Sequence, residues 1–170
     1  TVAYHTQKKF DLIAKYVEKW ASILTNTSSC NGIVFIDCMS NSGTYLNPEG
    51  EQIDGTASKC MEIIVKLIEN MPHLAAISLR NDIEQQKILE LERRIPKHRE
   101  NVKIQTYSMD RDSFLRELAE SSIDELRQNH YHTLLIYDPY DAHINWEVLS
   151  PFISTWGEVI INHMISDPIR

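Results

Sequence analysis

Hydrophobic and polar positions along the chain repeat with a period that switches between that of a helix and that of a strand. Apolar residues on one helical face predict helices over 7–24, 55–71 and 113–126, a charged helix ending before Pro96, and a short helix over 145–155 that Pro151 should kink or shorten. Short apolar runs predict five strands, at 33–36, 74–79, 102–107, 133–137 and 159–161.

Strands that alternate with helices at this spacing predict an α/β domain with a mainly parallel sheet. The run 33–36 has no polar alternation, so we expect a central strand that is buried on both faces. The run 102–107 does alternate, which is typical of an edge strand. The chain stops soon after the fifth strand, so we expect one domain over 1–170 that is truncated and lacks its C-terminal elements.

Two local features carry further expectations. Thr6 is the expected N-cap of the first helix. Residues 44–54, with Pro48 and Gly50, predict an irregular loop that is either a lid or an insertion and that is mobile without ligand.

Composition and charge limit the class of protein. The 170 residues are 42% hydrophobic and 24% charged, with no run long enough for a membrane span and no signal-peptide pattern, so we expect a cytoplasmic protein. Three cysteines without C-x-x-C spacing predict reduced, packed thiols. The net charge of −7 argues against broad binding of nucleic acid, although a local basic cluster remains at Arg93, Arg94, Lys97, His98 and Arg99.

Four acids follow successive strands, namely Asp37, Asp82, Asp110 and Asp138. The carboxyl ends of parallel strands share one crevice, so these side chains can converge on one ligand. An acid after the second strand is suited to ribose hydroxyls, and one after the third to a base. This pattern predicts a nucleotide-type site, while the alternative is that the acids are turn formers and helix caps.

The segment Asp138-Pro139-Tyr140 is the most specific short motif. Pro139 fixes the backbone direction, so Asp138 and Tyr140 can be presented to the crevice, where the aromatic ring can stack on a flat substrate. An ordinary strand-ending turn is the alternative. His130 and His132 have a spacing that could hold a metal, but no third ligand follows nearby, so packing roles are favoured and no metal site is predicted.

These motifs together resemble the class I S-adenosylmethionine-dependent methyltransferases, and more narrowly the three-Cys-motif partner (TcmP) family. The resemblance spans nearly the whole chain and includes His5-Thr6 with Lys9, the stretch 37–43, 55–57, Asp138-Pro139-Tyr140 with Trp146, and 160–162. It implies a Rossmann-like methyltransferase fold with strand order 3-2-1-4-5 and the cofactor S-adenosylmethionine. The implied cofactor-binding residues are Asp37, Met39, Ser40, Asn41, Ser42, Gly43, Asp82 and Asp110, and the implied catalytic residues are Asp138, Pro139 and Tyr140.

The sequence departs from the family pattern in the first loop, after the fourth strand and at the end of the second strand. Ser40 and Ser42 replace Ala and, commonly, Pro. Asn41 stands where the family has its first loop glycine, and Asn is the residue that best replaces Gly at positive φ. Asp141 replaces the last glycine of D-P-Y-G, and Leu79 stands where an acid often ends the second strand, which leaves Asp82 as a displaced substitute.

Three hypotheses follow. The first is a methyltransferase that acts on a nucleobase or another planar amine, with Asp138 holding the amine and Tyr140 stacking on its ring. The second is a catalytically degenerate domain of the same fold that works as a protein-interaction module, for instance with a three-Cys-motif protein. The third is a different nucleotide-binding α/β domain with strand order 2-1-3-4-5.

Overall fold

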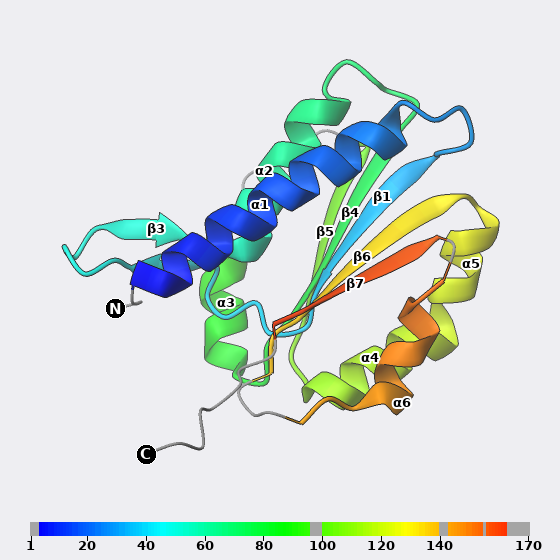
Figure 1. The fold of residues 1–170 in the computed structure, drawn as a ribbon. Helices are drawn as coiled ribbons and strands as arrows, with labels where there is room; N and C mark the ends of the chain where they lie inside the picture. Colours follow the sequence, from blue (N-terminus) through cyan, green and yellow to red (C-terminus); the bar gives the residue numbers. More distant parts are fainter. Residues whose placement is uncertain (1–3, 96–99, 140–142, 155, 163–170) are drawn as a thin grey trace, which may run out of the picture.

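The structure is a computed structural model, and it describes residues 4–95, 100–139, 143–154 and 156–162. Its centre is a five-stranded sheet in the order β5-β4-β1-β6-β7, in which every neighbouring pair is parallel (Figure 1). The strands are β1 (Gly32–Asp37), β4 (Ala75–Asn81), β5 (Val102–Tyr107), β6 (Tyr131–Tyr137) and β7 (Gly157–Ile161). The α/β class with a parallel sheet is therefore confirmed.

The labels in this order differ from 3-2-1-4-5 because two hairpin strands, β2 and β3, also take numbers along the chain. Counted within the large sheet alone, the five strands lie third, second, first, fourth and fifth. The order 2-1-3-4-5 is excluded, since β1 lies between β4 and β6.

The position of β1 follows from its side chains. All six of its residues are buried, and they pair with β4 on one side and with β6 on the other. Ile33 and Phe35 pack into one core cluster and Val34 and Ile36 into a second one, on the opposite face. Because both faces are apolar, the strand can be covered on both sides, and the prediction of a central strand is confirmed. The edge position predicted for 102–107 is confirmed by β5.

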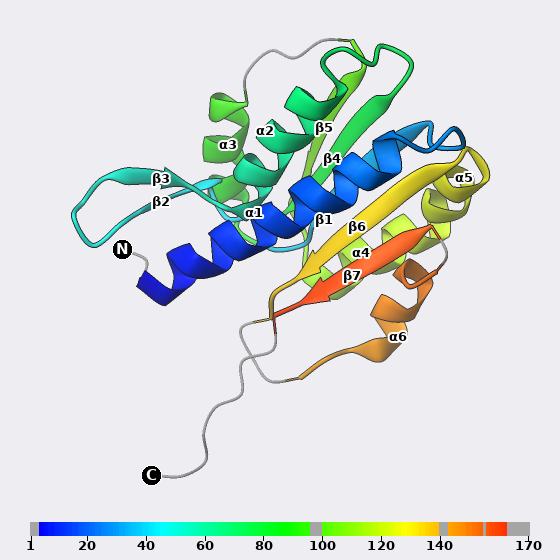
Figure 2. The ribbon, with the colours of Figure 1, turned by 45° about the horizontal axis from the view of Figure 1, so that its top comes forward.

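Helices cover the two faces of the sheet. α1 (Tyr4–Thr25), α2 (Thr56–Ile68) and α3 (Gln85–Arg94) lie on one face, as Figures 1 and 2 show. α4 (Arg111–Ser121), α5 (Ile123–Gln128) and α6 (Trp146–Leu149) lie on the other, with a 3-10 turn over Ser150–Phe152. Among the described residues, no helix combines the length and the apolar character that crossing a membrane requires.

The prediction of an irregular loop over 44–54 is wrong. This segment is an antiparallel hairpin of β2 (Thr44–Leu46) and β3 (Gln52–Asp54) that stands away from the large sheet (Figure 2). The side chain of Asn47 closes its turn, because Oδ1 accepts the N–H of Glu51 at 2.7 Å and Nδ2 donates to Oε2 of Glu51 at 3.0 Å. Each strand has only three residues, too few to show a hydrophobic period.

Helix ends were predicted less well than helix positions. α1 begins at Tyr4, so Thr6 lies inside the helix and is not its N-cap. The helix predicted over 113–126 is two helices that meet at Ser122. The helix predicted over 145–155 is shortened to α6 and the 3-10 turn that contains Pro151, as expected for a proline in a helical pattern.

Candidate functional site

Three of the four predicted strand-end acids lie near one another at the carboxyl edge of the sheet. The charges of Asp82 and Asp138 both raise the pKa of Asp37, which shows that the three carboxylates interact. Asp110 has a different role, because its side chain accepts the N–H of Ser113 at 3.0 Å and caps α4. Hydrogen bonds from the side chain and from the backbone N–H of Ser113 lower the pKa of Asp110, and the helix-cap alternative therefore holds for this acid.

Asp37 is a core residue of the site. Its side chain is buried, and burial raises the pKa of its carboxyl from 3.8 to about 6, while the N–H of Met39 and the charge of Arg80 oppose that shift. Although it ends a strand at the crevice, Asp37 belongs to the core, because it is the last residue of the strand that is covered on both faces.

The loop after β1 is closed by its own hydrogen bonds. Asn41 has a φ of +55°, as predicted for the residue that replaces the first glycine, and Gly43 has a φ of +79°. Every backbone N–H from Met39 to Gly43 is engaged within the chain. The acceptors are Oδ1 of Asp37, the carbonyl of Asn81, Oδ2 of Asp82, Oδ1 of Asn41 and the carbonyl of Ser40, in that order.

These contacts decide which ligands the loop can serve. A phosphate-binding loop turns its N–H groups toward the ligand, whereas all five N–H groups of this loop donate to acceptors within the chain. At this edge of the sheet, the carboxylate oxygens of Asp37, Asp82 and Asp138 can still accept further hydrogen bonds. The edge therefore suits a ligand that donates hydrogen bonds or carries positive charge.

Asp82 joins two loops. Its Oδ2 accepts the N–H of Asn41 and its Oδ1 accepts the N–H of Glu84, each at 3.0 Å, and the side chain is buried. A carboxylate oxygen has room for a second hydrogen bond, so Asp82 can hold this loop and still accept from a hydroxyl.

Asp138 is held by two residues from distant elements. Nζ of Lys9, on α1, lies 2.5 Å from its Oδ2, and Nδ2 of Asn162, just after β7, donates to its Oδ1 at 2.5 Å. Pro139 is buried beside it, and Tyr140 lies outside the described residues. The sequence marked Lys9 only through the family resemblance, because a lysine on a helix gives no local sign of its partner.

Arg80 is a further buried charge, and the sequence analysis did not single it out. It is the residue before Asn81, the last residue of β4, it is 3% exposed, and it pairs in register with Asp37 on the neighbouring strand. The available signal was the pattern of β4, in which Ser78 and Arg80 are polar at a period of two, and the residue between them and the three before them are apolar. Such a period places both side chains on one face of the sheet.

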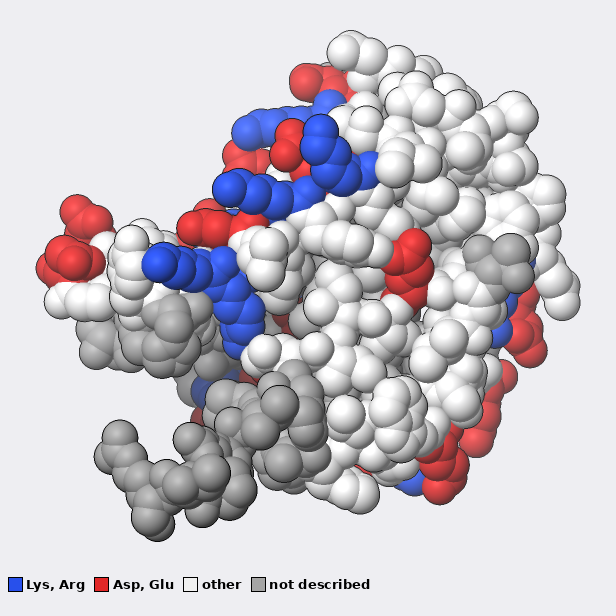
Figure 3. Space-filling view, in the orientation of Figure 1, with Lys and Arg blue, Asp and Glu red and all other residues white. Residues whose placement is uncertain are grey.

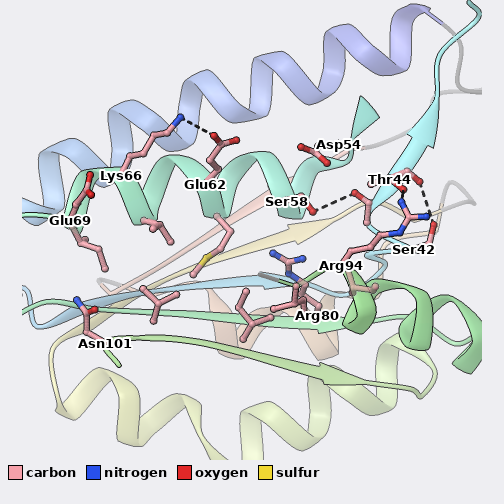
Figure 4. A pocket seen from close by; sticks show the side chains of 18 residues that line it. Ser42, Thr44, Asp54, Ser58, Glu62, Lys66, Glu69, Arg80, Arg94 and Asn101 are labelled. Atoms are coloured by element: carbon pink, nitrogen blue, oxygen red, sulfur yellow. Dashed lines mark hydrogen bonds and ion pairs between the residues drawn. The ribbon is translucent and has the colours of Figure 1, made fainter. Parts of the chain in front are cut away.

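A cavity of about 650 Å³ lies on that face, between α2 and α3 (Figure 4). Ser42 and Gly43 of the β1 loop line one end of it, and Asn101, just before β5, lines the other. Arg80 lies in the middle and Arg94, at the end of α3, donates a hydrogen bond to Thr44 beside the loop. Most of the cavity is thus away from the carboxyl edge where the cofactor site was predicted.

The histidines and cysteines do not form a metal site in the part of the chain that the structure describes. The rings of His130 and His132 contact the ring of Trp156, with centroids 5.0 and 4.6 Å apart, which is the packing role favoured above. No group of three or more potential metal ligands comes together among the described residues. All three cysteines are free and buried, as predicted: Cys30, Cys38 and Cys60.

Comparison with known proteins adds no assignment. No family model matches the chain, and no curated protein matches it. The methyltransferase resemblance therefore rests on the motifs and stays a prediction.

Proposed function

We propose that this protein is a class I methyltransferase-like enzyme with a Rossmann-like fold, and that it binds S-adenosylmethionine at the carboxyl edge of β1 and β4. The observation that carries the proposal is the closed β1 loop beside three interacting carboxylates. S-adenosylmethionine has an ammonium group, a sulfonium and ribose hydroxyls, and it lacks phosphate. These groups match an edge that offers hydrogen-bond acceptors and whose backbone N–H groups are already hydrogen-bonded within the chain.

Each residue has a proposed part in this site. Asp82 would accept from the ribose, because it follows the second strand of the sheet and holds the β1 loop in place. The carboxylate of Asp37 would favour the cationic end of the cofactor. When bound, S-adenosylmethionine would supply an electrophilic methyl group.

Asp138 would hold the methyl acceptor. Lys9 and Asn162 fix its carboxylate, so a planar amine that donates to it would meet a preformed partner. Part of its charge is neutralised by Lys9, which argues for orientation of a neutral amine over binding of a cation. Tyr140 keeps its proposed stacking role as a prediction.

The charge distribution on the surface indicates which class of methyl acceptor fits. On the face shown in Figure 3, basic and acidic side chains are interspersed over α1 and α2, and the rest of that face has few basic groups. With a net charge of −7, this distribution supports a small planar amine or a single base over a long nucleic acid.

The competing function is the protein-interaction module, for which a three-Cys-motif protein is the proposed partner. The internal hydrogen bonds favour it, because Asp82 and Asp138 already have partners within the chain.

Calorimetric titration with S-adenosylmethionine and S-adenosylhomocysteine separates the two functions. We expect saturable binding of both ligands, and a loss of about tenfold or more in affinity for Asp82→Asn, because one acceptor oxygen becomes a donor. Asp110→Asn is the matched control, since the side chain of Asp110 caps α4, and the affinity of this variant should equal that of the parent. No heat from the parent with either ligand would overturn the enzyme proposal and leave the interaction function.

A further inference from the structure

The cavity between α2 and α3 is an apolar chamber with one buried charge. Its walls are apolar side chains from α2, from α3 and the residue after it, and from β5: Met61, Val65, Ile68, Leu91, Ile95, Val102 and Ile104. The other charged residues that line it are exposed and mark its rim: Asp54, Glu62, Lys66, Glu69 and Arg94. Among the charged lining residues that the structure describes, Arg80 alone is buried.

The guanidinium of Arg80 points into this chamber. Figure 4 shows it rising from β4 toward α2, in the middle of the cavity. Nε donates to Oγ of Ser78 at 3.0 Å and Nη2 donates to the carbonyl of Ala57 at 3.4 Å. The Nη1 group makes no hydrogen bond with any residue that the structure describes.

Arg80 also has no direct counter-ion among the described residues, because none of the ion pairs between them includes it. Desolvation lowers the pKa of Arg80, and the charges of Asp37 and Asp54 oppose that shift without forming an ion pair with it. A buried cation whose hydrogen-bond partners are all neutral is costly, and natural proteins offset that cost with a paired anion.

We propose that this cavity binds a monovalent anion with an apolar tail, namely a medium-chain carboxylate. The carboxylate would accept from the free N–H groups of Arg80, and the hydrocarbon would lie along Met61, Val65 and Ile104. A volume of about 650 Å³ is within the range of small-molecule sites.

A single carboxylate fits the buried cation of this cavity. It brings one negative charge and matches the planar fork of a guanidinium, whereas a phosphate monoester would bring a second negative charge into a chamber in which Arg80 is the only buried charge among the described lining residues. The site lies on the face of the sheet, so it does not depend on the methyltransferase proposal.

Decanoate, kept below its micellar concentration, is the probe, with decanol and decylamine as matched ligands. We expect saturable binding of decanoate by calorimetry, with decanol about 10- to 100-fold weaker, because a charge-assisted hydrogen bond is lost, and decylamine weaker than decanol. Arg80→Met should bring the affinity for decanoate down to that for decanol. Lys103→Met is the control, since Lys103 is an exposed residue of β5 that does not line this cavity, and its affinity should not change.

A second variant keeps the test sharp if Arg80→Met does not fold. Ile104→Trp fills the chamber and leaves Arg80 in place, so it should abolish binding of both decanoate and decanol. Equal affinities of the parent for decanoate and decylamine, unchanged binding by Ile104→Trp, or binding only above the micellar concentration would each overturn the proposal. Titration with S-adenosylmethionine reports on the other site independently.

Discussion

Nζ of Lys9 lies 2.5 Å from Oδ2 of Asp138, across 129 positions of the chain. This contact ties the first turns of α1 to the end of β6, and Tyr16 adds a second tie by donating to the carboxylate of Glu158 on β7. The carboxylate of Glu158 raises the pKa of Tyr16 to about 12, which keeps the phenol a donor at neutral pH. α1 is thus an integral part of the domain and of the candidate site.

Lys9→Met should lower the free energy of unfolding by about 1 kcal/mol, because it removes a partly buried ion pair and leaves Asp138 with Asn162 alone. Urea unfolding at pH 7 measures the change. Lys66→Met is the matched control, since Lys66 and Glu62 form a more exposed pair on α2, and it should cost clearly less stability than Lys9→Met. Equal effects of the two substitutions would show that the Lys9 contact adds nothing beyond a surface pair.

Asp37→Asn should stabilise the protein at pH 7. The folded state raises the pKa of Asp37 from 3.8 to about 6, so it binds this proton more tightly than the unfolded state does. Stability from this group is complete below pH 3.8 and is lost as the pH rises past 6. The variant should therefore gain on the order of 1–3 kcal/mol over the parent between about pH 4 and pH 7.

Asp110→Asn should show the opposite pH dependence of stability to Asp37→Asn. The folded state lowers the pKa of Asp110, so its contribution is present above the ordinary pKa of an aspartate and is lost as the pH falls. Asp110→Asn should therefore cost more stability at pH 7 than at pH 3, the opposite trend to Asp37→Asn. Unfolding curves across this pH range compare the two, and parallel trends would contradict the assignment of Asp37 as a destabilised acid.

Asn41→Val should cost about 1 kcal/mol or more, because a β-branched side chain resists a φ of +55°. Asn41→Gly should be close to neutral, since the backbone gains freedom at positive φ but Ser42 loses the acceptor that Oδ1 now offers at 2.8 Å. Thermal unfolding of both variants measures this difference. A valine variant as stable as the parent would mean that the loop leaves this conformation easily.

Gly157→Ala should be strongly destabilising, by about 2 kcal/mol or more, because a Cβ there would lie 2.3 Å from the carbonyl oxygen of Phe152. Gly50→Ala is the comparison, since Gly50 has a φ of +82° but open space around it, and it should cost about 1 kcal/mol from backbone strain alone. The denaturant midpoints of the two variants show which substitution costs more stability. A larger loss at Gly50 would show that the backbone of the turn before β7 can move away.

The central place of β1 and the edge place of β5 could be predicted from the sequence. The reason is that the hydrophobic period reports how many faces of an element are covered, and this depends mainly on the element's own residues. The positive φ of Asn41 is likewise a local preference of one residue type. The hairpin of β2 and β3 was missed because strands of three residues show no period.

The contacts that make the sites were decided only by the tertiary structure. Lys9 and Asp138, or Asn41 and Asp82, come together because distant segments pack against the same edge, and no periodicity in either segment encodes its partner. The buried position of Arg80 has the same origin, since an arginine at a strand end meets solvent or a cavity according to how α2 and α3 cover it. The sequence by itself determined which faces are apolar and which residues follow the strands, whereas the packing of the helices determined which of those polar groups are paired, which are buried and which face a ligand.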